Sequence, residues 1–200
     1  MFRVYPSTVG TDREIYCTLL INTYSFAGTD TTAAAIRSIL LWVITRPDVL
    51  SKIHSELTIA KHEERLSTPV KDKEARLLPY LQACIKEGIR ICPPVVNPSF
   101  KVVPKGGDEI GGYYVPEGIE IGISALGLVR NHKIWGPDAD FFQPDRWLKP
   151  STEMKAMKST WDMLFGQGSS HCLGKDIALM QIGVIVVEVS KCLHLDYSDR

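Results

Sequence analysis

The sequence predicts a mainly α-helical fold with a minor β part, an α+β arrangement, in a single domain over residues 1–200. Stretches rich in Ala, Leu and Ile are bounded by prolines in the first half of the chain. Short β-like runs, separated by Gly and Pro, occupy residues 95–124, and an apolar stretch begins at Ile177. With 200 residues, of which 44% are apolar, the chain is long enough to bury a core.

Three helices are expected before residue 95. The first runs from residue 14 to about residue 46 and ends before Pro47, which is placed to open the second helix, to about residue 63. Pro79 starts the third helix, residues 79–91, and the Pro93-Pro94 pair stops it, because a residue before proline is pushed out of the helical region. The third helix has an apolar face with a period near 3.6, made of Leu81, Cys84, Ile85, Gly88 and Ile89.

The later part of the chain changes character. Between residues 95 and 124, Gly pairs and a Pro-Glu-Gly turn separate β-like runs at 113–115 and 119–123, which is typical of small hairpins. Residues 130–150 predict a packed irregular segment, and a Gly/Ser loop begins at Phe165. The last helix, from Cys172 to about residue 193, is apolar on nearly all sides, so we expect it to be buried.

Composition argues against several kinds of function. The 23 basic and 23 acidic side chains cancel, so no overall charge favours nucleic acid or an anionic membrane. The most apolar stretch is interrupted by Gln181 and Glu188 and is shorter than the ~18–20 residues of a membrane span. The chain has 5 cysteines and no Cys-x-x-Cys pair, which supports neither a disulfide framework nor a structural zinc site.

Cys172 is the first candidate for chemistry. A thiol at the start of a helix lies near the first-turn amides and the positive end of the helix dipole, which stabilise a thiolate. Gly166, Gly168 and Gly174 remove side chains around it, so a flat, bulky group could approach the backbone closely. A buried structural cysteine is the alternative, because Cys is among the most buried residue types.

Glu87 and Arg90 lie three residues apart and share one face of the third helix. One interpretation is an exposed ion pair, which contributes little to stability. The isoleucines around the two residues favour burial instead. A buried pair needs further hydrogen-bond partners, and Arg146 is the candidate for a third member.

Asp30, Thr31 and Thr32 interrupt an otherwise apolar helix. One interpretation is a helix N-cap at Thr29 or Asp30, or hydroxyls that bond back to the preceding turn, and the sequence alone favours the cap. The other is a locally opened helix whose polar groups point into a cavity and pass protons.

Taken together, four clusters resemble the cytochrome P450 haem-thiolate monooxygenases in order and rough spacing. They are Ala27-Gly28-Thr29-Asp30-Thr31-Thr32, Glu87-x-x-Arg90, Phe142-x-Pro144-x-Arg146-Trp147 and Phe165-x-x-Gly168-x-x-x-Cys172-x-Gly174. The stretches Trp135-Gly136-Pro137-Asp138-Ala139 and Cys172-Leu173-Gly174-Lys175 are most similar to fungal microsomal members. The resemblance covers essentially the whole chain but only the C-terminal half of the family, so it implies a truncated, partial cytochrome P450 domain.

The resemblance implies haem b (iron protoporphyrin IX) as the cofactor, with Cys172 as the axial thiolate ligand of the iron. The residues that it assigns to haem binding are Ala27, Gly28, Phe165, Gly166, Gly168, Cys172 and Gly174. It assigns proton relay to Asp30 and Thr31, on the oxygen-binding helix of residues 14–46. It assigns a buried network that braces the Cys loop to Glu87, Arg90 and Arg146.

The reaction implied by the resemblance is the insertion of one oxygen atom from O2 into a small apolar organic substrate, with electrons from a reductase. Family members usually carry Arg two positions before the Cys, facing a haem propionate. This chain has Ser170 there, His171 is one residue off, and Lys101 is a candidate to take part instead.

The second departure from the family is length. Full-length relatives are usually anchored to the endoplasmic reticulum by an N-terminal helix, and most of their substrate pocket lies in segments without a counterpart here. We therefore expect this chain alone to be inactive and to leave apolar faces of its first and last helices uncovered. The alternative to a monooxygenase is a truncated remnant or interaction fragment that does not hold haem.

Overall fold

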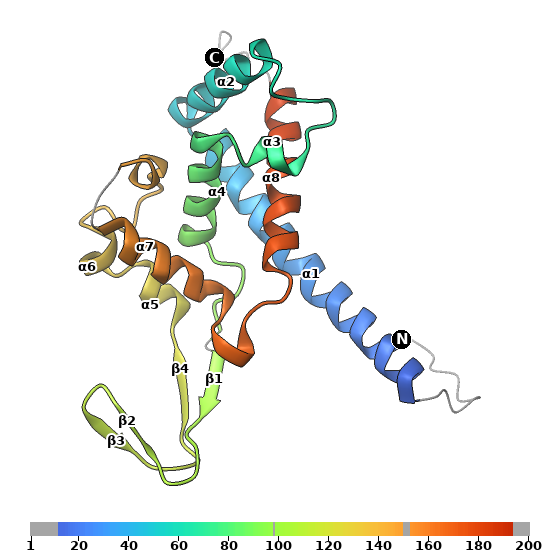
Figure 1. The fold of residues 1–200 in the computed structure, drawn as a ribbon. Helices are drawn as coiled ribbons and strands as arrows, with labels where there is room; N and C mark the ends of the chain where they lie inside the picture. The colour runs from blue at the N-terminus through green and yellow to red at the C-terminus, as the bar shows by residue number, and fades with distance from the viewer. Residues whose placement is uncertain (1–11, 98, 150–152, 194–200) are drawn as a thin grey trace.

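The computed structural model describes residues 12–97, 99–149 and 153–193. It is mainly helical with two small two-stranded sheets, as the sequence predicts (Figure 1). The α-helices are α1 (Asp12–Ile44), α2 (Pro47–His62), α3 (Asp72–Ala75), α4 (Pro79–Ile91), α5 (Ala125–Val129), α6 (His132–Trp135), α7 (Glu153–Asp162) and α8 (Lys175–Cys192). The 3₁₀-helices are η1 (Pro144–Trp147), η2 (Met163–Phe165) and η3 (Gly168–Ser170). The strands are β1 (Ser99–Val102), β2 (Asp108–Ile110), β3 (Tyr113–Val115) and β4 (Glu120–Ile123).

Prolines begin two of the long helices where the sequence places them. α2 starts at Pro47 and α4 at Pro79, positions where the missing N–H is not needed for helical hydrogen bonding. Glu56 of α2 caps α4, because its carboxylate accepts hydrogen bonds from the N–H groups of Tyr80 (2.7 Å) and Leu81 (2.9 Å). Burial raises the pKa of Glu56, although the two amide hydrogen bonds act to lower it. The cap joins α2 to α4.

α1 is one continuous helix, so the N-cap expected at Thr29 or Asp30 is wrong. The hydroxyl of Thr29 donates to the carbonyl of Ser25 (2.6 Å), and that of Thr31 donates to the carbonyl of Ala27 (2.7 Å). Hydroxyls bonded back to the preceding turn are satisfied without ending the helix. The structure therefore favours hydroxyls bonded back to the preceding turn over a cap.

The core lies where α1, α2, α4 and α8 meet, with α8 crossing α1 partway along its length (Figure 1). Ile39 of α1 lies directly against Gly88 of α4: a Cβ atom at Gly88 would lie 2.5 Å from Cγ1 of Ile39. Aromatic rings continue the packing towards α7 and η2. In this row, the ring centroids of Trp147 and Trp161 are 6.4 Å apart and those of Trp161 and Phe165 are 5.1 Å apart.

The expectation that the last helix is buried holds for only part of it. From Ile182 onward, α8 has buried apolar side chains at Ile182, Val186 and Val187. Leu173 just before the helix and Ile177 in its first turn are instead 79% and 59% exposed. The first half of α1 also exposes large apolar side chains, namely Tyr16, Leu19, Leu20, Ile21 and Phe26. An apolar sequence buries a helix only where a neighbour covers it.

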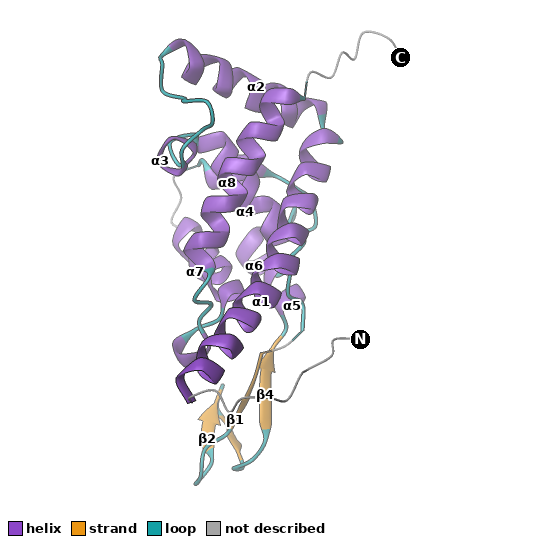
Figure 2. Ribbon diagram, turned by 90° about the vertical axis from the view of Figure 1, so that its right-hand side faces the viewer, coloured by secondary structure: helices purple, strands orange, loops and turns teal. Residues whose placement is uncertain are grey.

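The two antiparallel sheets extend from one end of the helical part, away from α2 and α3 (Figure 2). β2 and β3 form a hairpin, whereas β1 pairs with β4 across the intervening hairpin, with Phe100 opposite Gly122. Among the described residues, no helix combines the length and apolar character that a membrane crossing requires.

Candidate functional site

Cys172 lies at the end of a tightly closed loop. Its N–H donates a 2.7 Å hydrogen bond to the carbonyl of Phe165. Gly166 and Gly168 have φ angles of 73° and 62°, in the left-handed region that favours glycine. A Cβ atom at Gly166 would overlap the carbonyl oxygen of Ser170. The path of the loop itself therefore requires glycine at position 166.

The thiol of Cys172 is exposed and lies beside the start of α8. Gly174 is the N-cap residue of this helix, and a Cβ atom there would lie 4.0 Å from Sγ of Cys172. The alternative of a buried structural cysteine describes Cys84 instead, which is 0% exposed. Burial raises the pKa of the Cys84 thiol well above its usual range. Cys172 has the accessibility that a ligand needs.

Glu87 and Arg90 form a fully buried ion pair on α4, so the interpretation as an exposed pair is wrong. Two hydrogen bonds of 2.8 and 2.9 Å join the guanidinium to the two carboxylate oxygens, and both side chains are 0% exposed. The other guanidinium hydrogen bonds run to backbone carbonyls of Val129 (2.7 Å), Ala139 (2.6 Å) and Phe141 (2.9 Å). The pair thereby fastens α4 to the irregular segment of residues 129–141.

Arg146 of η1 joins this network. Its Nε donates to Oε1 of Glu87 (3.0 Å), and its Nη1 donates to the carbonyl of Trp135 (2.7 Å). Its Nη2 lies 3.1 Å from a carboxylate oxygen of Asp138. The structure thus brings Glu87, Arg90 and Arg146 together.

Two further groups of the network were not singled out from the sequence. The indole N–H of Trp147 donates to Oε2 of Glu87 (2.8 Å), and the backbone N–H of Gln143 donates to Oε1 (2.8 Å). Trp147 could have been found, since it follows Arg146 in the same motif and a buried indole needs an acceptor. The backbone group of Gln143 carries no sequence signal.

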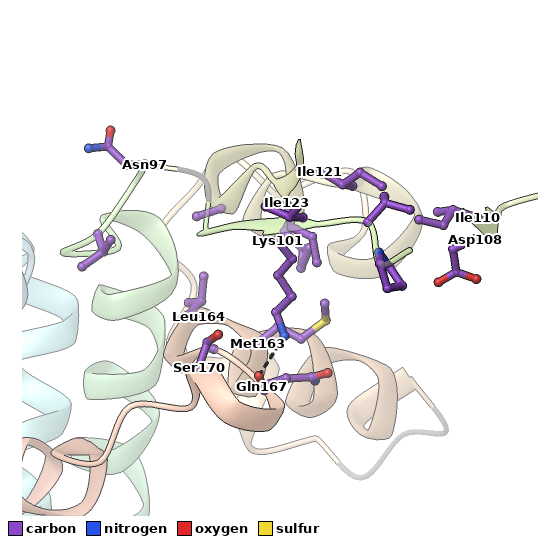
Figure 3. Close-up of a pocket in the computed structure, with 17 residues that line it drawn as sticks. Asn97, Lys101, Asp108, Ile110, Ile121, Ile123, Met163, Leu164, Gln167 and Ser170 are labelled. Carbon is purple, nitrogen blue, oxygen red and sulfur yellow. Dashed lines mark hydrogen bonds between the residues drawn. The ribbon is translucent and has the colours of Figure 1, made fainter. Parts of the chain in front are cut away.

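A cavity of about 470 Å³ lies between the β1–β4 sheet and the loop before Cys172 (Figure 3). Its walls are mostly apolar, with Val102, Ile121, Ile123, Met163 and Leu164 among them. Lys101 crosses the cavity, and its Nζ donates to the carbonyl of Gln167 (3.3 Å). Ser170 lines the same cavity. One ammonium and one hydroxyl therefore lie beside the Cys172 loop.

Asp30 and Thr31 lie elsewhere, in a groove of about 420 Å³ that they line with Arg37 and Pro94. The remaining candidates of α1, Ala27 and Gly28, are exposed, and nothing lies within 4 Å of the Cβ position at Gly28. Although α1 packs on α8, no hydrogen bond or ion pair in the described ranges joins the groove residues to the Cys172 loop. The structure therefore places Asp30 and Thr31 in one groove and the Cys172 loop beside another cavity.

Comparison with known proteins identifies related chains. A family model described as Cytochrome P450 matches residues 10–192. The chain is 38% identical over 170 residues to "Cytochrome P450 monooxygenase aba1" of Botryotinia fuckeliana (strain B05.10), covering 84% of this chain and 33% of the relative. It is 37% identical over 170 residues to "Pisatin demethylase" of Fusarium vanettenii, covering 85% of this chain and 32% of the relative. The chain spans about one third of the length of these relatives.

Proposed function

Because the chain belongs to the cytochrome P450 family, we propose that it carries the haem-binding part of a monooxygenase, with Cys172 as the axial thiolate of the haem iron. The observation that carries the proposal is the setting of Cys172: an exposed thiol that ends a closed glycine loop at the start of α8.

The residues present fit haem. The described part of the chain contains no group of three or more His, Cys, Asp or Glu side chains that could hold a metal ion. A single exposed cysteine would suffice to hold haem iron, because the porphyrin, and not the protein, would supply the equatorial donor atoms. The ammonium of Lys101 and the hydroxyl of Ser170, on the wall of the cavity beside the loop, suit a propionate carboxylate. Lys101 then supplies the cation that Ser170 does not.

When bound, haem supplies the activation of O2 for the insertion of one oxygen atom into an organic substrate. The Thr31 hydroxyl donates its hydrogen bond to the carbonyl of Ala27, so its oxygen can accept a hydrogen bond from a donor in the groove. The carboxylate of Asp30, the preceding residue, would take up and release the proton that is relayed through the groove. Electrons from a reductase and a small apolar substrate complete the proposed reaction.

Glu87, Arg90 and Arg146 have a structural part in this proposal. They fix residues 129–147, which carry Trp147, and the ring of Trp147 packs on Trp161 next to Phe165. The network therefore acts on the Cys172 loop through packed aromatic rings rather than through contact with a reactant.

The experiment that tests the proposal is an absorbance spectrum of the full chain, supplied with haem, reduced and treated with carbon monoxide. We expect a thiolate-type spectrum that Cys172→Ser abolishes. Cys192→Ser is the matched control, because Cys192 is also exposed but lies at the other end of α8. A thiolate-type spectrum that persists in the Cys172→Ser variant contradicts the proposal.

The alternative, a chain that does not hold haem on its own, is favoured by one observation: Leu173 and Ile177 beside Cys172, and the first half of α1, expose large apolar side chains. Uncovered apolar surface of this kind promotes association with other chains. Size-exclusion chromatography of the haem-treated chain distinguishes the two. A monodisperse monomer with stoichiometric haem excludes the alternative, and aggregates without haem absorbance support it.

A further inference from the structure

We propose that Lys175 is a positioning residue for Cys172. The proposal rests on the haem-thiolate function inferred above. It states that the side chain of Lys175 fastens the start of α8 to the junction of α7 and η2, and that this contact fixes the loop that carries the thiol.

The evidence is the set of contacts that Lys175 makes. Its Nζ lies 2.7 Å from Oδ1 of Asp162, the last residue of α7. The same ammonium lies 5.7 Å from the ring centroid of Trp161 and 5.1 Å from that of Phe165. One cation is therefore held by a carboxylate and two aromatic rings, all from the segment that precedes the Cys172 loop.

Phe165 connects this cluster to the thiol. Its ring faces the Lys175 ammonium, and its carbonyl accepts the hydrogen bond from the N–H of Cys172. The loop is thus closed twice, once by the backbone between Phe165 and Cys172 and once by the side chain of Lys175. Because Lys175 is only three residues after Cys172, release of its side chain frees the C-terminal end of the loop.

Burial favours a real contribution from these contacts. The side chain of Lys175 is 19% exposed, and cation–π contacts and ion pairs grow stronger as water is excluded. Trp161, which contacts the ammonium, is fixed in turn because its indole N–H donates to the carbonyl of Lys86 (2.9 Å). The ammonium therefore binds to a rigid surface rather than to a mobile side chain.

α8 offers a matched control. Lys191 pairs with Glu188 at 2.9 Å, with 27% and 35% of the two side chains exposed, and it lies at the far end of the helix. Lys191→Met removes a lysine–carboxylate pair that lies within the same helix, together with the 3.4 Å hydrogen bond to the carbonyl of Ser67, at a distance from the Cys172 loop. Any general effect of losing a lysine pair from α8 appears in this variant too.

The test is site-resolved hydrogen exchange of the full chain for wild type, Lys175→Met, Lys175→Arg and Lys191→Met. We expect the amide of Cys172 to exchange about tenfold faster in Lys175→Met, the size of effect expected for loss of one ion pair and its cation–π contacts. Lys175→Arg keeps the charge and restores the wild-type rate, Lys191→Met leaves the rate unchanged, and the buried amides of α4 exchange at the same rate in all variants.

The proposal is overturned if Lys175→Met leaves the Cys172 amide at its wild-type rate, if Lys191→Met changes it equally, or if the α4 amides accelerate equally. Exchange is measured without haem, so it decides the role of Lys175 even if the wild-type chain proves unable to hold haem. Where the wild type does give a thiolate-type spectrum, Lys175→Met must weaken it and Lys175→Arg must retain it.

Discussion

The indole nitrogen of Trp147 lies 2.8 Å from a carboxylate oxygen of Glu87, and the two side chains meet where almost no water reaches them. This bond brings a neutral donor to a carboxylate that already receives two arginines. Buried charges are tolerated only when their hydrogen-bonding capacity is filled. The indole N–H of Trp147 therefore supplies one of the hydrogen bonds that Glu87 would otherwise make to water.

We expect Trp147→Phe to lower the free energy of unfolding by at least ~1–3 kcal/mol, the usual cost of an unmet hydrogen bond to a buried group. Trp42→Phe is the control, since Trp42 stacks on Phe142 at 5.4 Å and no indole hydrogen bond from it occurs among the described residues. Urea denaturation of both variants measures the difference. Equal losses would mean that ring packing, and not the bond to Glu87, sets the cost.

Arg90→Met should be far more damaging than loss of a surface arginine. Removal of Arg90 leaves the buried Glu87 carboxylate partly uncompensated and three carbonyl groups without their donor, with an expected loss of ~3–5 kcal/mol. Arg76→Met is the matched control, because Arg76 pairs with Asp72 at 2.7 Å on the surface, where ~0–1 kcal/mol is typical. A similar loss of stability in the two variants would refute the structural role of the buried network.

Gly88→Ala tests the close approach of α1 and α4. The added methyl group would lie 2.5 Å from Cγ1 of Ile39 and 3.2 Å from its Cα, so backbone has to move, at an expected cost of ~1–3 kcal/mol. Gly28→Ala adds the same group to a helical position with open space and should raise stability by roughly 0.4–1 kcal/mol. Thermal unfolding of the two variants should therefore shift in opposite directions, and a shift in the same direction contradicts the packing described.

Stability in acid should depend on Glu74. Hydrogen bonds from the N–H and hydroxyl of Ser67 and from the N–H of Lys71 lower the pKa of Glu74 from 4.5 to about 2. Because the folded pKa is the lower one, the stabilisation is complete above pH 4.5 and is lost as the pH falls towards 2. Glu74→Gln should flatten this part of the stability curve. An NMR titration that places the Glu74 midpoint near 4.5 would refute the hydrogen bonds.

Proline and the helical period made the long helices predictable. Pro47 and Pro79 mark the starts of α2 and α4 because their fixed φ and missing N–H suit the first helical position. The N-cap interpretation fails at Thr29 and Asp30, because these side chains favour the start of a helix but lie inside one continuous helix. A Thr hydroxyl can instead bond within its own helix, and packing of the second half of α1 decides between the two outcomes.

Contacts between residues far apart in the sequence were harder to predict. The hairpin strand β3 could be located from its glycines, but the pairing of β1 with β4 depends on neither local pattern nor turn chemistry. α7 is absent from the expected helices, although it supplies Trp161 and Asp162 next to the Cys172 loop. The partial exposure of α8 also has no local signal, because it depends on which elements lie beside the helix.

Arg90 grips its neighbouring segment through the carbonyl oxygens of Val129, Ala139 and Phe141 rather than through their side chains. Every amino acid supplies the same carbonyl group, so a substitution at the exposed Phe141 keeps the hydrogen bond to Arg90. One residue inserted or deleted between positions 129 and 141 changes which oxygens face the guanidinium. Arg90 therefore constrains the length of this segment, which tolerates substitutions but not insertions or deletions.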